Sequence, residues 1–144
     1  MSDDSDTAEI RALIEEIDAA HHDKDAAAIV AHYTPDATVF DLAPPLSQTG
    51  VDLRELEAWL DTWAGPVNRE SRDLDIRVSG DLALCHGFFR ISATTRDGSN
   101  AIFWMRATLG LTRDAGAWKI VHEHASVPFY MDGSYRAAVD LEPA

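Results

Sequence analysis

Two histidines lie two residues apart in residues 118–128, a segment whose pattern is otherwise typical of a β-strand. Successive side chains of a strand point to opposite faces, so His122, His124 and Ser126 share one face. The strand before it carries Arg106. An arginine beside a histidine supplies a fixed cation and a donor whose charge depends on pH. This pair suits a carboxylate, an enolate or a carbonyl oxygen.

The turn between these two strands predicts which residues face each other. Residues 114–116 fit a three-residue hairpin loop that ends on a glycine in the left-handed conformation. The predicted pairs are then Arg106 with His124, Thr108 with His122 and Trp104 with Ser126. We expect this polar and aromatic face to line the inside of a curved sheet. A loop one residue shorter or longer would put the histidines on the other face from the arginine.

A carboxylate and several aromatic side chains complete the predicted pocket. Asp41 follows the predicted strand 37–41 and precedes a proline-rich loop. A partly buried aspartate has a raised pKa and can act as a general base on an acidic C–H. We predict Asp41, Arg106 and His124 as catalytic residues. The predicted substrate-binding residues are Tyr33, Trp59, Trp63, Phe88, Trp104, His122 and Ser126.

Each of these residues also has a purely structural interpretation. The histidines can be core or interface residues with satisfied partners, and Arg106 can pair with Glu123 or Asp41. The tryptophans of residues 51–63 can belong to the core, and Asp41 can be a turn residue. His-x-His with a distant carboxylate can also form a metal site. Only two such ligands have a fixed spacing here, so we predict no metal and no cofactor.

Composition narrows the class of protein and of partner. The chain has 144 residues, of which 46% are hydrophobic and 26% charged, as expected for one globular domain over residues 1–144. The net charge of −13 repels phosphate backbones and anionic lipids, so we expect neither nucleic acid nor a membrane as partner. With no signal peptide or long apolar run, the prediction is a cytoplasmic protein. The single cysteine, Cys85, lies in an apolar run and is expected to be buried.

The order of the predicted elements indicates the fold class. A helix is expected from about Asp6, because apolar residues recur at helical spacing at positions 10, 13, 14, 17 and 20. A short helix follows over residues 26–30 and a third over 51–63. From residue 67 onward, alternating β segments are separated by turn signals. Helices followed by an antiparallel meander predict an α+β fold with helices on one face of the sheet. Residues 131–144 are a C-terminal tail, either a short helix or loose.

This order, the segment DATVFD (36–41) and the pattern W-K-I-V-H-x-H-x-S-V-P of the last strand resemble the nuclear transport factor 2-like superfamily. The resemblance covers residues 6–130 and is closest to SnoaL-like members and ketosteroid isomerase homologues. It implies a cystatin-like cone, in which N-terminal helices pack on a strongly curved antiparallel sheet, with a hydrophobic pocket at the open end. It also implies homodimers or larger assemblies formed through the outer face of the sheet.

The resemblance also suggests roles for residues. Asp41 falls where ketosteroid isomerase has its general base. The oxyanion-binding tyrosine of that enzyme would fall near Ile17, which cannot donate a hydrogen bond, so Arg106, His124 or Tyr33 would replace it. Two functions stay open. One is an isomerase or cyclase type of enzyme that acts on a small organic molecule with Asp41 as base. The other is a non-catalytic domain that binds a small apolar or carboxylate ligand, or oligomerises.

Overall fold

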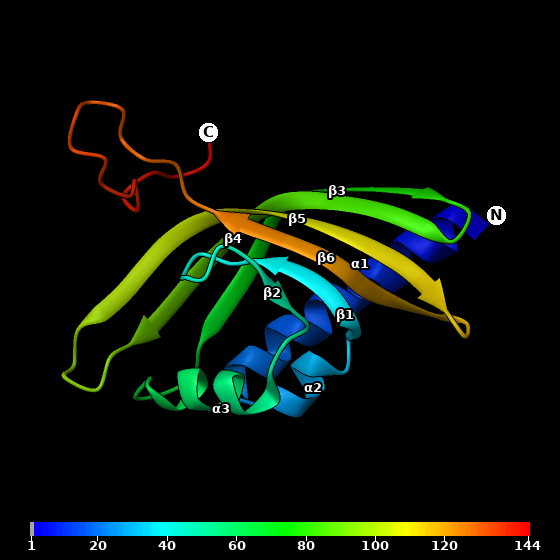
Figure 1. Cartoon of the computed structure of the whole chain (residues 1–144), viewed down its shortest axis with the longest axis horizontal. Helices are drawn as coiled ribbons and strands as arrows, with labels where there is room; N and C mark the ends of the chain where they lie inside the picture. Colours follow the sequence, from blue (N-terminus) through cyan, green and yellow to red (C-terminus); the bar gives the residue numbers. More distant parts are fainter. Residues whose placement is uncertain (1) are drawn as a thin grey trace.

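A long curved sheet covers three helices in the structure, a computed structural model that describes residues 2–144 and the side chains of 4–144 (Figure 1). The helices are α1 (Ser2–His22), α2 (Ala26–Val30) and α3 (Leu53–Asp61). The strands are β1 (Tyr33–Phe40), β2 (Gln48–Thr49), β3 (Asn68–Ser79), β4 (Leu82–Thr94), β5 (Asn100–Asp114) and β6 (Ala117–Ser126). This confirms the predicted α+β class.

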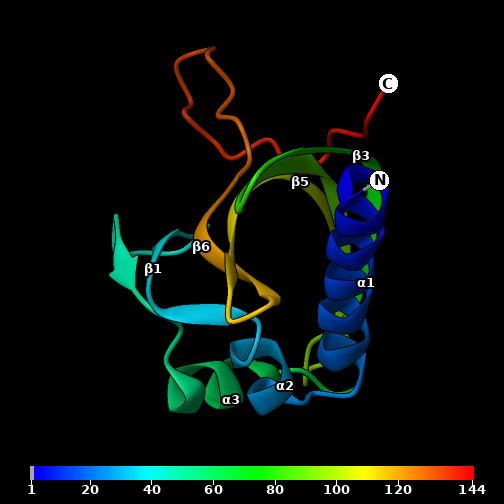
Figure 2. The ribbon, with the colours of Figure 1, turned by 90° about the vertical axis from the view of Figure 1, so that its right-hand side faces the viewer.

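The sheet has the strand order β2-β1-β6-β5-β4-β3. Strands β3 to β6 form an antiparallel meander, and β1 joins β6 in parallel. Figure 2 shows the sheet curving around α1, with α2 and α3 at the open side of the curve. The sheet therefore has a concave face toward the helices and a convex outer face, which is the predicted cone.

The apolar stripe of α1 packs on the concave face of the sheet. Ile10, Ile14 and Ile17 are at most 1% exposed, and they contact the inward-facing side chains of β4, β5 and β6. Burying such a side chain stabilises the fold by roughly 1.5–3 kcal/mol. Cys85 lies in the same cluster and is buried, as predicted. A second apolar cluster joins α2 and α3 to the other end of the sheet through Ile29, Leu60 and other small and aliphatic residues.

The first helix begins at Ser2, earlier than predicted, and Asp6 lies within it. The Asp6 carboxylate is buried and accepts hydrogen bonds from the Arg113 guanidinium at 2.7 and 2.9 Å. These hydrogen bonds between Asp6 and Arg113 link α1 to β5. The third helix is shorter than predicted, and Asp52 caps it by accepting the Glu55 N–H at 2.9 Å.

The turn between β5 and β6 has two residues, so the predicted three-residue loop is wrong. Ala115 and Gly116 both have positive φ, 50° and 83°, as in the two-residue turns that match the twist of a hairpin. Asp114 therefore pairs with Ala117.

The two-residue turn moves the pairing of β5 with β6 by one residue from the prediction, and a register shift farther along β6 moves it by one more. The pairing shifts by one residue between Gly110 and Leu111, where β6 has an extra residue. The pairs beyond the shift are Gly110 with His122, Thr108 with His124 and Arg106 with Ser126. The predicted register is thus wrong by two residues. Two single-residue offsets restore the alternation, so the predicted residues still share one face.

Candidate functional site

The polar face predicted from β5 and β6 lies on the outer, convex side of the sheet. Ala107 and Ala125, which alternate with Arg106 and His124, are buried in the core beneath α1. Arg106 and His124 are exposed, and their side chains point away from the helices. The prediction that they line the inside of the cone is wrong. The apolar stripe of α1 requires the apolar face of the sheet, which leaves the polar face outside.

Four further predicted residues, Phe88, Trp104, His122 and Ser126, follow the same alternation and also lie on the outer face. Arg106 Nε donates to Ser126 Oγ at 3.0 Å, and His122 Nδ1 lies 2.8 Å from the Thr38 carbonyl oxygen. Phe88, Arg106, His124 and Ser126 line a hollow of about 550 Å³ together with Asp73, His86, Gly87, Ala107 and Thr108. We call this the outer hollow.

Asp41 is separated from Arg106 and His124 by the sheet. It follows Val39, which is buried on the concave side, and Phe40, whose ring contacts the His124 ring at 5.5 Å on the outer side. The Asp41 carboxylate is exposed and accepts the Leu42 N–H at 2.7 Å. Alternation along β1 thus turns Asp41 away from the outer face, which carries Arg106 and His124.

The concave side carries its own polar groups, beginning with Tyr33 and Glu123. Glu123 alternates with the outward histidines of β6 and so points inward. The Tyr33 hydroxyl donates to Glu123 Oε1 at 2.7 Å. Burial raises the pKa of Glu123 and outweighs the opposing effect of the Arg69 cation. Of the residues predicted from the sequence, Tyr33 therefore belongs to this interior site through its hydrogen bond to Glu123.

An ion pair joins α1 to β3 on the same side. Arg69 Nε lies 3.0 Å from Asp18 Oδ1, and the two side chains are only 7% and 15% exposed. The Arg69 guanidinium also lies 4.4 Å from the centre of the Phe89 ring, a cation–π contact. Burial raises the pKa of Asp18 to about 6, while Arg69 opposes the rise.

Arg69 is the cation that influences all the titratable groups around it. Its charge lowers the pKa of Asp18, His21, Tyr33 and Glu123. Burial has a larger effect than Arg69 on each of these groups. It raises the pKa of Asp18, Tyr33 and Glu123, and it lowers the pKa of His21 to about 4. His21 is therefore neutral at pH 7, and its Nδ1 donates to the Ile17 carbonyl at 2.8 Å, since a carbonyl can only accept. We call Asp18, His21, Tyr33, Arg69 and Glu123 the Arg69 cluster.

A hollow of about 400 Å³ opens on the Asp18–Arg69 pair between α1 and β3. Its other lining residues are Ala19, His22, Asn68, Glu70, Arg90 and Ser92. Small-molecule sites commonly have volumes of about 300–1,000 Å³. Both residues of the pair are part of the lining of this hollow, although Asp18 Oδ1 and Arg69 Nε themselves are buried.

Two of the predicted tryptophans, Trp59 and Trp63, lie on and just after α3, close to the C-terminal end of α1. Trp63 packs on the second apolar cluster, and its ring meets the Trp59 ring edge-on at 6.0 Å. The Trp59 ring lies 6.4 Å from the His21 ring. The indole N–H of Trp63 is buried and has no hydrogen-bond partner among residues 2–144. Such a donor is uncommon in folded proteins.

Four members of the Arg69 cluster were not predicted as site residues from the sequence: Asp18, His21, Arg69 and Glu123. Glu123 gave a usable signal, because it is a glutamate on the apolar face of a strand. Arg69 shares the inward face of β3 with buried Val67, but only the fold shows that the helix residue beside it is Asp18. His21 was expected to be solvated at the end of the first helix, but it is buried, and Asp18 gave no signal because polar residues are common on an amphipathic helix.

The sequence profile of the SnoaL-like domain family matches residues 10–130. The chain belongs to this family. An NTF2-like protein of unknown function from Pseudomonas putida KT2440 is 36% identical, with a TM-score of 0.83, and the match covers 94% of this chain and 95% of that one. This confirms the resemblance to the nuclear transport factor 2-like superfamily that the last strand suggested.

More distant structures share the SnoaL-like fold. A candidate dehydratase of the NTF2-like family from Streptomyces avermitilis has 18% identity and a TM-score of 0.75, over 85% of this chain and 96% of that one. A candidate scytalone dehydratase from Novosphingobium aromaticivorans has 17% identity and a TM-score of 0.78, over 97% and 95%. At these identities the likeness concerns the fold alone. Among proteins with curated functions, none matches the chain.

Neither a membrane-spanning helix nor a metal-binding cluster is found among residues 2–144. No helix in this range has both the length and the apolar character needed to cross a membrane. Within the same range, no three His, Cys, Asp or Glu side chains converge in a way that could hold a metal ion.

Proposed function

We propose that this SnoaL-like protein binds a small carbonyl or hydroxy compound at the Arg69 cluster and transfers a proton to or from it. The observation that carries the proposal is the Asp18–Arg69 pair, which faces a hollow of about 400 Å³. A carboxylate with a pKa of about 6 is mostly ionised at pH 7 yet binds a proton readily. This is the property that a general base needs near neutral pH.

The cluster divides the chemistry between its members. Asp18 would take a proton from the carbon next to a carbonyl group, and the electrons of that C–H bond would move onto the carbonyl oxygen. Arg69 would stabilise the resulting oxyanion. Glu123, held by the Tyr33 hydroxyl, is a second carboxyl group with a raised pKa, but it does not line the 400 Å³ hollow, so Asp18 itself would return the proton. Return at another carbon gives isomerisation, and loss of a neighbouring hydroxyl group as water gives dehydration.

Asp41 stays a candidate base in this proposal. Its negative charge contributes to the raised pKa of both Tyr33 and Glu123, so it lies close enough to influence the cluster. The candidate dehydratases among the structural relatives are consistent with proton transfer, and they do not select the carboxylate. The experiment must therefore compare all three carboxylates.

Exchange of carbon-bound hydrogen for deuterium tests the proposal without knowledge of the product. Cyclohexanone, β-tetralone and levulinate are incubated with the protein in deuterium oxide, and label uptake is followed by NMR. We expect protein-dependent exchange on at least one probe, lowered about 100-fold or more in Asp18→Asn. Glu123→Gln and Asp41→Asn rank the other two carboxylates. Glu9→Gln, an exposed carboxylate of α1, is the matched control and should leave exchange unchanged.

Two results would contradict the proposal. Exchange that persists in all three carboxylate variants would put the chemistry elsewhere. Probes that bind, as thermal shifts report, but show no exchange would leave a binding site without proton transfer.

We also propose self-association through the outer face as a second function. Leu82, Leu84, Phe88 and Ile102 are 62%, 48%, 36% and 52% exposed there, and they are spread along β4 and the neighbouring strand β5. Exposed apolar side chains gathered on one face are typical of interfaces between proteins. Light scattering after size-exclusion chromatography should give twice the monomer mass, and a monomer at all concentrations would contradict this proposal.

A further inference from the structure

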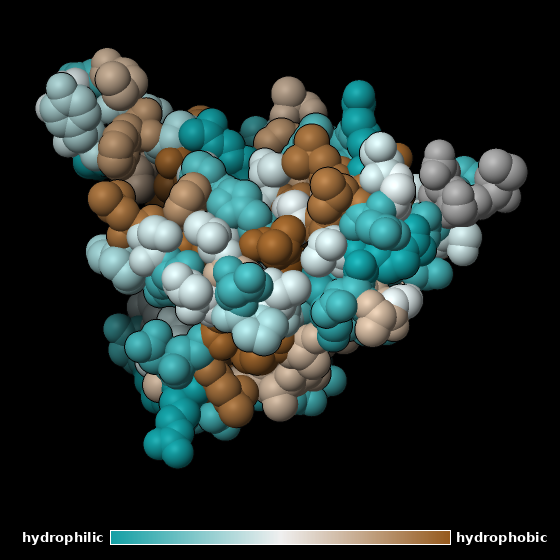
Figure 3. Space-filling view, turned by 45° about the vertical axis from the view of Figure 1, so that its right-hand side comes forward, coloured by the Kyte–Doolittle hydropathy of each residue, from teal (hydrophilic) through white to brown (hydrophobic). Residues whose placement is uncertain are grey.

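The last residues of the chain form an arm that projects from the body. It comprises residues 128–142 and leaves the sheet just after β6, on the side away from the helices. Figures 1 and 2 show it from two directions: its first part loops away from the sheet, whereas its last part returns toward the outer side of the sheet, and Ala138 within it is buried. In the space-filling view it is the protrusion at the upper left, with hydrophobic and hydrophilic residues side by side (Figure 3).

The arm has its own internal hydrogen bonds. Ala138 N donates to the Pro128 carbonyl and Tyr130 N donates to the Arg136 carbonyl, both at 2.8 Å. The Tyr130 hydroxyl donates to Asp140. These bonds fold the arm into a hairpin-like shape. A hairpin of this size is at best marginally stable by itself in water, so its order calls for further contacts.

The arm exposes large apolar side chains. Phe129 is 64% exposed, Met131 82% and Tyr135 64%. Val139 and Leu141 are about half exposed beyond them. Such a surface on a protruding segment gains stability when a partner covers it, because burial removes apolar area from water.

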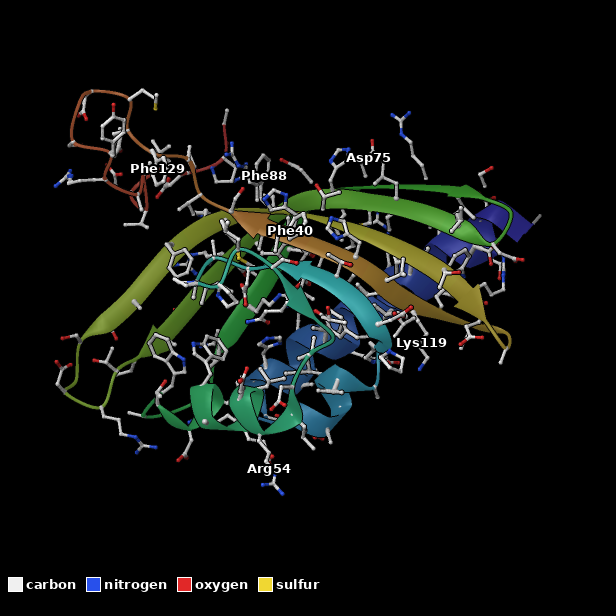
Figure 4. All side chains as sticks on the ribbon, in the orientation of Figure 1. Phe40, Arg54, Asp75, Phe88, Lys119 and Phe129 are labelled. Carbon is white, nitrogen blue, oxygen red and sulfur yellow. The ribbon has the colours of Figure 1, made fainter. Side chains whose placement is uncertain are left out.

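The outer hollow has the complementary chemistry. Phe88 supplies an aromatic wall, and Figure 4 shows it projecting from the outer side of the sheet, the side from which the arm extends. Arg106, His86 and His124 supply positive or protonatable groups, against the single carboxylate of Asp73. The arm is acidic, because Asp132, Asp140 and Glu142 outnumber Arg136. Charge and apolar character therefore match between arm and hollow.

The geometry points to a second copy as the partner. Ser126 lines the outer hollow and is also the last residue of β6, so the arm begins at the rim of its own hollow, and its first residues lead away from that hollow (Figure 1). In a two-fold dimer every contact is reciprocal, so if the arm of one copy contacts the hollow of the other, the reverse contact also forms. Outer faces paired in this way carry each arm toward the hollow of the other copy. We propose that residues 128–142 of one copy dock in the outer hollow of a second copy, and this rests on the proposed self-association.

Single variants test the two halves of the contact. A chain that ends at Val127 lacks the arm, and Arg106→Glu reverses the charge of the hollow. We expect each to weaken self-association at least about tenfold, measured by light scattering over a concentration series. Arg54→Glu is the matched control, because Arg54 is exposed on α3 and points away from the sheet (Figure 4). It should leave self-association unchanged, and circular dichroism checks that every variant is folded.

A complementation experiment identifies the partner of the arm. The armless chain keeps its hollow, and the Arg106→Glu chain keeps its arm. Mixed together they can form one arm–hollow contact, whereas neither forms one alone. We expect the mixture to contain a heterodimer about tenfold tighter than either homodimer.

Failure of the arm inference can be distinguished from failure of the proposed self-association. An armless chain that dimerises like the full chain, or a mixture without preferred heterodimers, overturns the arm inference and leaves self-association standing. A full chain that is monomeric throughout removes both proposals. If levulinate then shifts the His124 ring signals in NMR spectra, the hollow takes a small anion, which also overturns the arm inference.

Discussion

Arg69 of β3 and Asp18 of α1 form an ion pair at 3.0 Å between the edge strand of the sheet and the helix beneath it. The pair links two segments that are far apart in the sequence, and it anchors a cluster whose members all respond to the same cation. Removing one partner of a buried pair leaves the other charge without compensation. The pair is therefore important both to the stability of the fold and to the proposed chemistry.

Replacing the cation tests this dual role. In Arg69→Met the side chain can still pack on Phe89, but Asp18 loses its partner, so its pKa should rise further. We expect the free energy of unfolding to fall by about 3 kcal/mol at pH 8 and by less at pH 5, where Asp18 can be protonated. Urea denaturation at both pH values measures this. Arg77→Met, at a guanidinium with an exposed side chain, should leave the free energy of unfolding nearly unchanged at both pH values. An equal loss at both pH values would show that the Asp18 charge is not responsible.

The pH dependence of stability should contain two opposing contributions. The pKa of Asp18 rises from 3.8 to about 6 on folding, so its contribution is present at low pH and is lost as pH rises from about 4 to about 6. The pKa of His21 falls from 6.5 to about 4, so its contribution is present above pH 6.5 and is lost as pH falls toward 4. Over pH 4–6 the two changes offset each other.

One variant of each residue separates the contributions of Asp18 and His21 to the pH dependence of stability. Asp18→Asn should leave the His21 contribution uncompensated, so stability should fall more steeply than in the wild type from pH 6.5 to pH 4. The extra fall is on the order of 2 kcal/mol. In His21→Gln, stability should fall less steeply than in the wild type over the same pH range. Thermal denaturation across this range measures both slopes, and parallel curves for the wild type and both variants would refute the assignment.

Gly87 is expected to tolerate no side chain. A Cβ at this position would lie 2.8 Å from Leu74 Cδ2 and 3.1 Å from the Arg72 carbonyl oxygen. The register of β3 shifts between Arg72 and Asp75, which brings that backbone close to β4. We expect Gly87→Ala to lower the free energy of unfolding by about 1–3 kcal/mol. At Gly65 a Cβ would meet nothing within 4 Å, so Gly65→Ala is the control. Equal effects in urea denaturation would contradict the steric explanation.

Cys85 should be unreactive in the folded protein. It is buried in the main core, and burial raises the pKa of its thiol to about 11. The thiolate is the reactive form, so alkylation at pH 8 should be slow until the protein unfolds. Iodoacetamide labelling followed by mass spectrometry, with and without urea, measures the difference. Fast labelling without urea would mean that β4 opens locally.

The shape of the fold could be predicted from periodicity because periodicity has local causes. The helical spacing of Ile10, Ile14 and Ile17 predicted the face that packs on the sheet, and the turn signals predicted the meander. The register of the last hairpin could not be predicted in the same way. It depends on the two-residue turn at Ala115 and on an extra residue in β6, and neither has a distinctive sequence signature.

The amino-acid sequence by itself determined the α+β class, the order of the elements, the SnoaL-like family and the set of residues that share a strand face. Alternation requires His124 and Ser126 to lie on the same side of β6 wherever that strand goes. The tertiary structure alone decided which face the helices cover. Covering the apolar face put Arg106 and His124 outside, and it turned Glu123 inward toward Tyr33. The Arg69–Asp18 pair is likewise a product of packing, because local sequence rules do not specify contacts between distant segments.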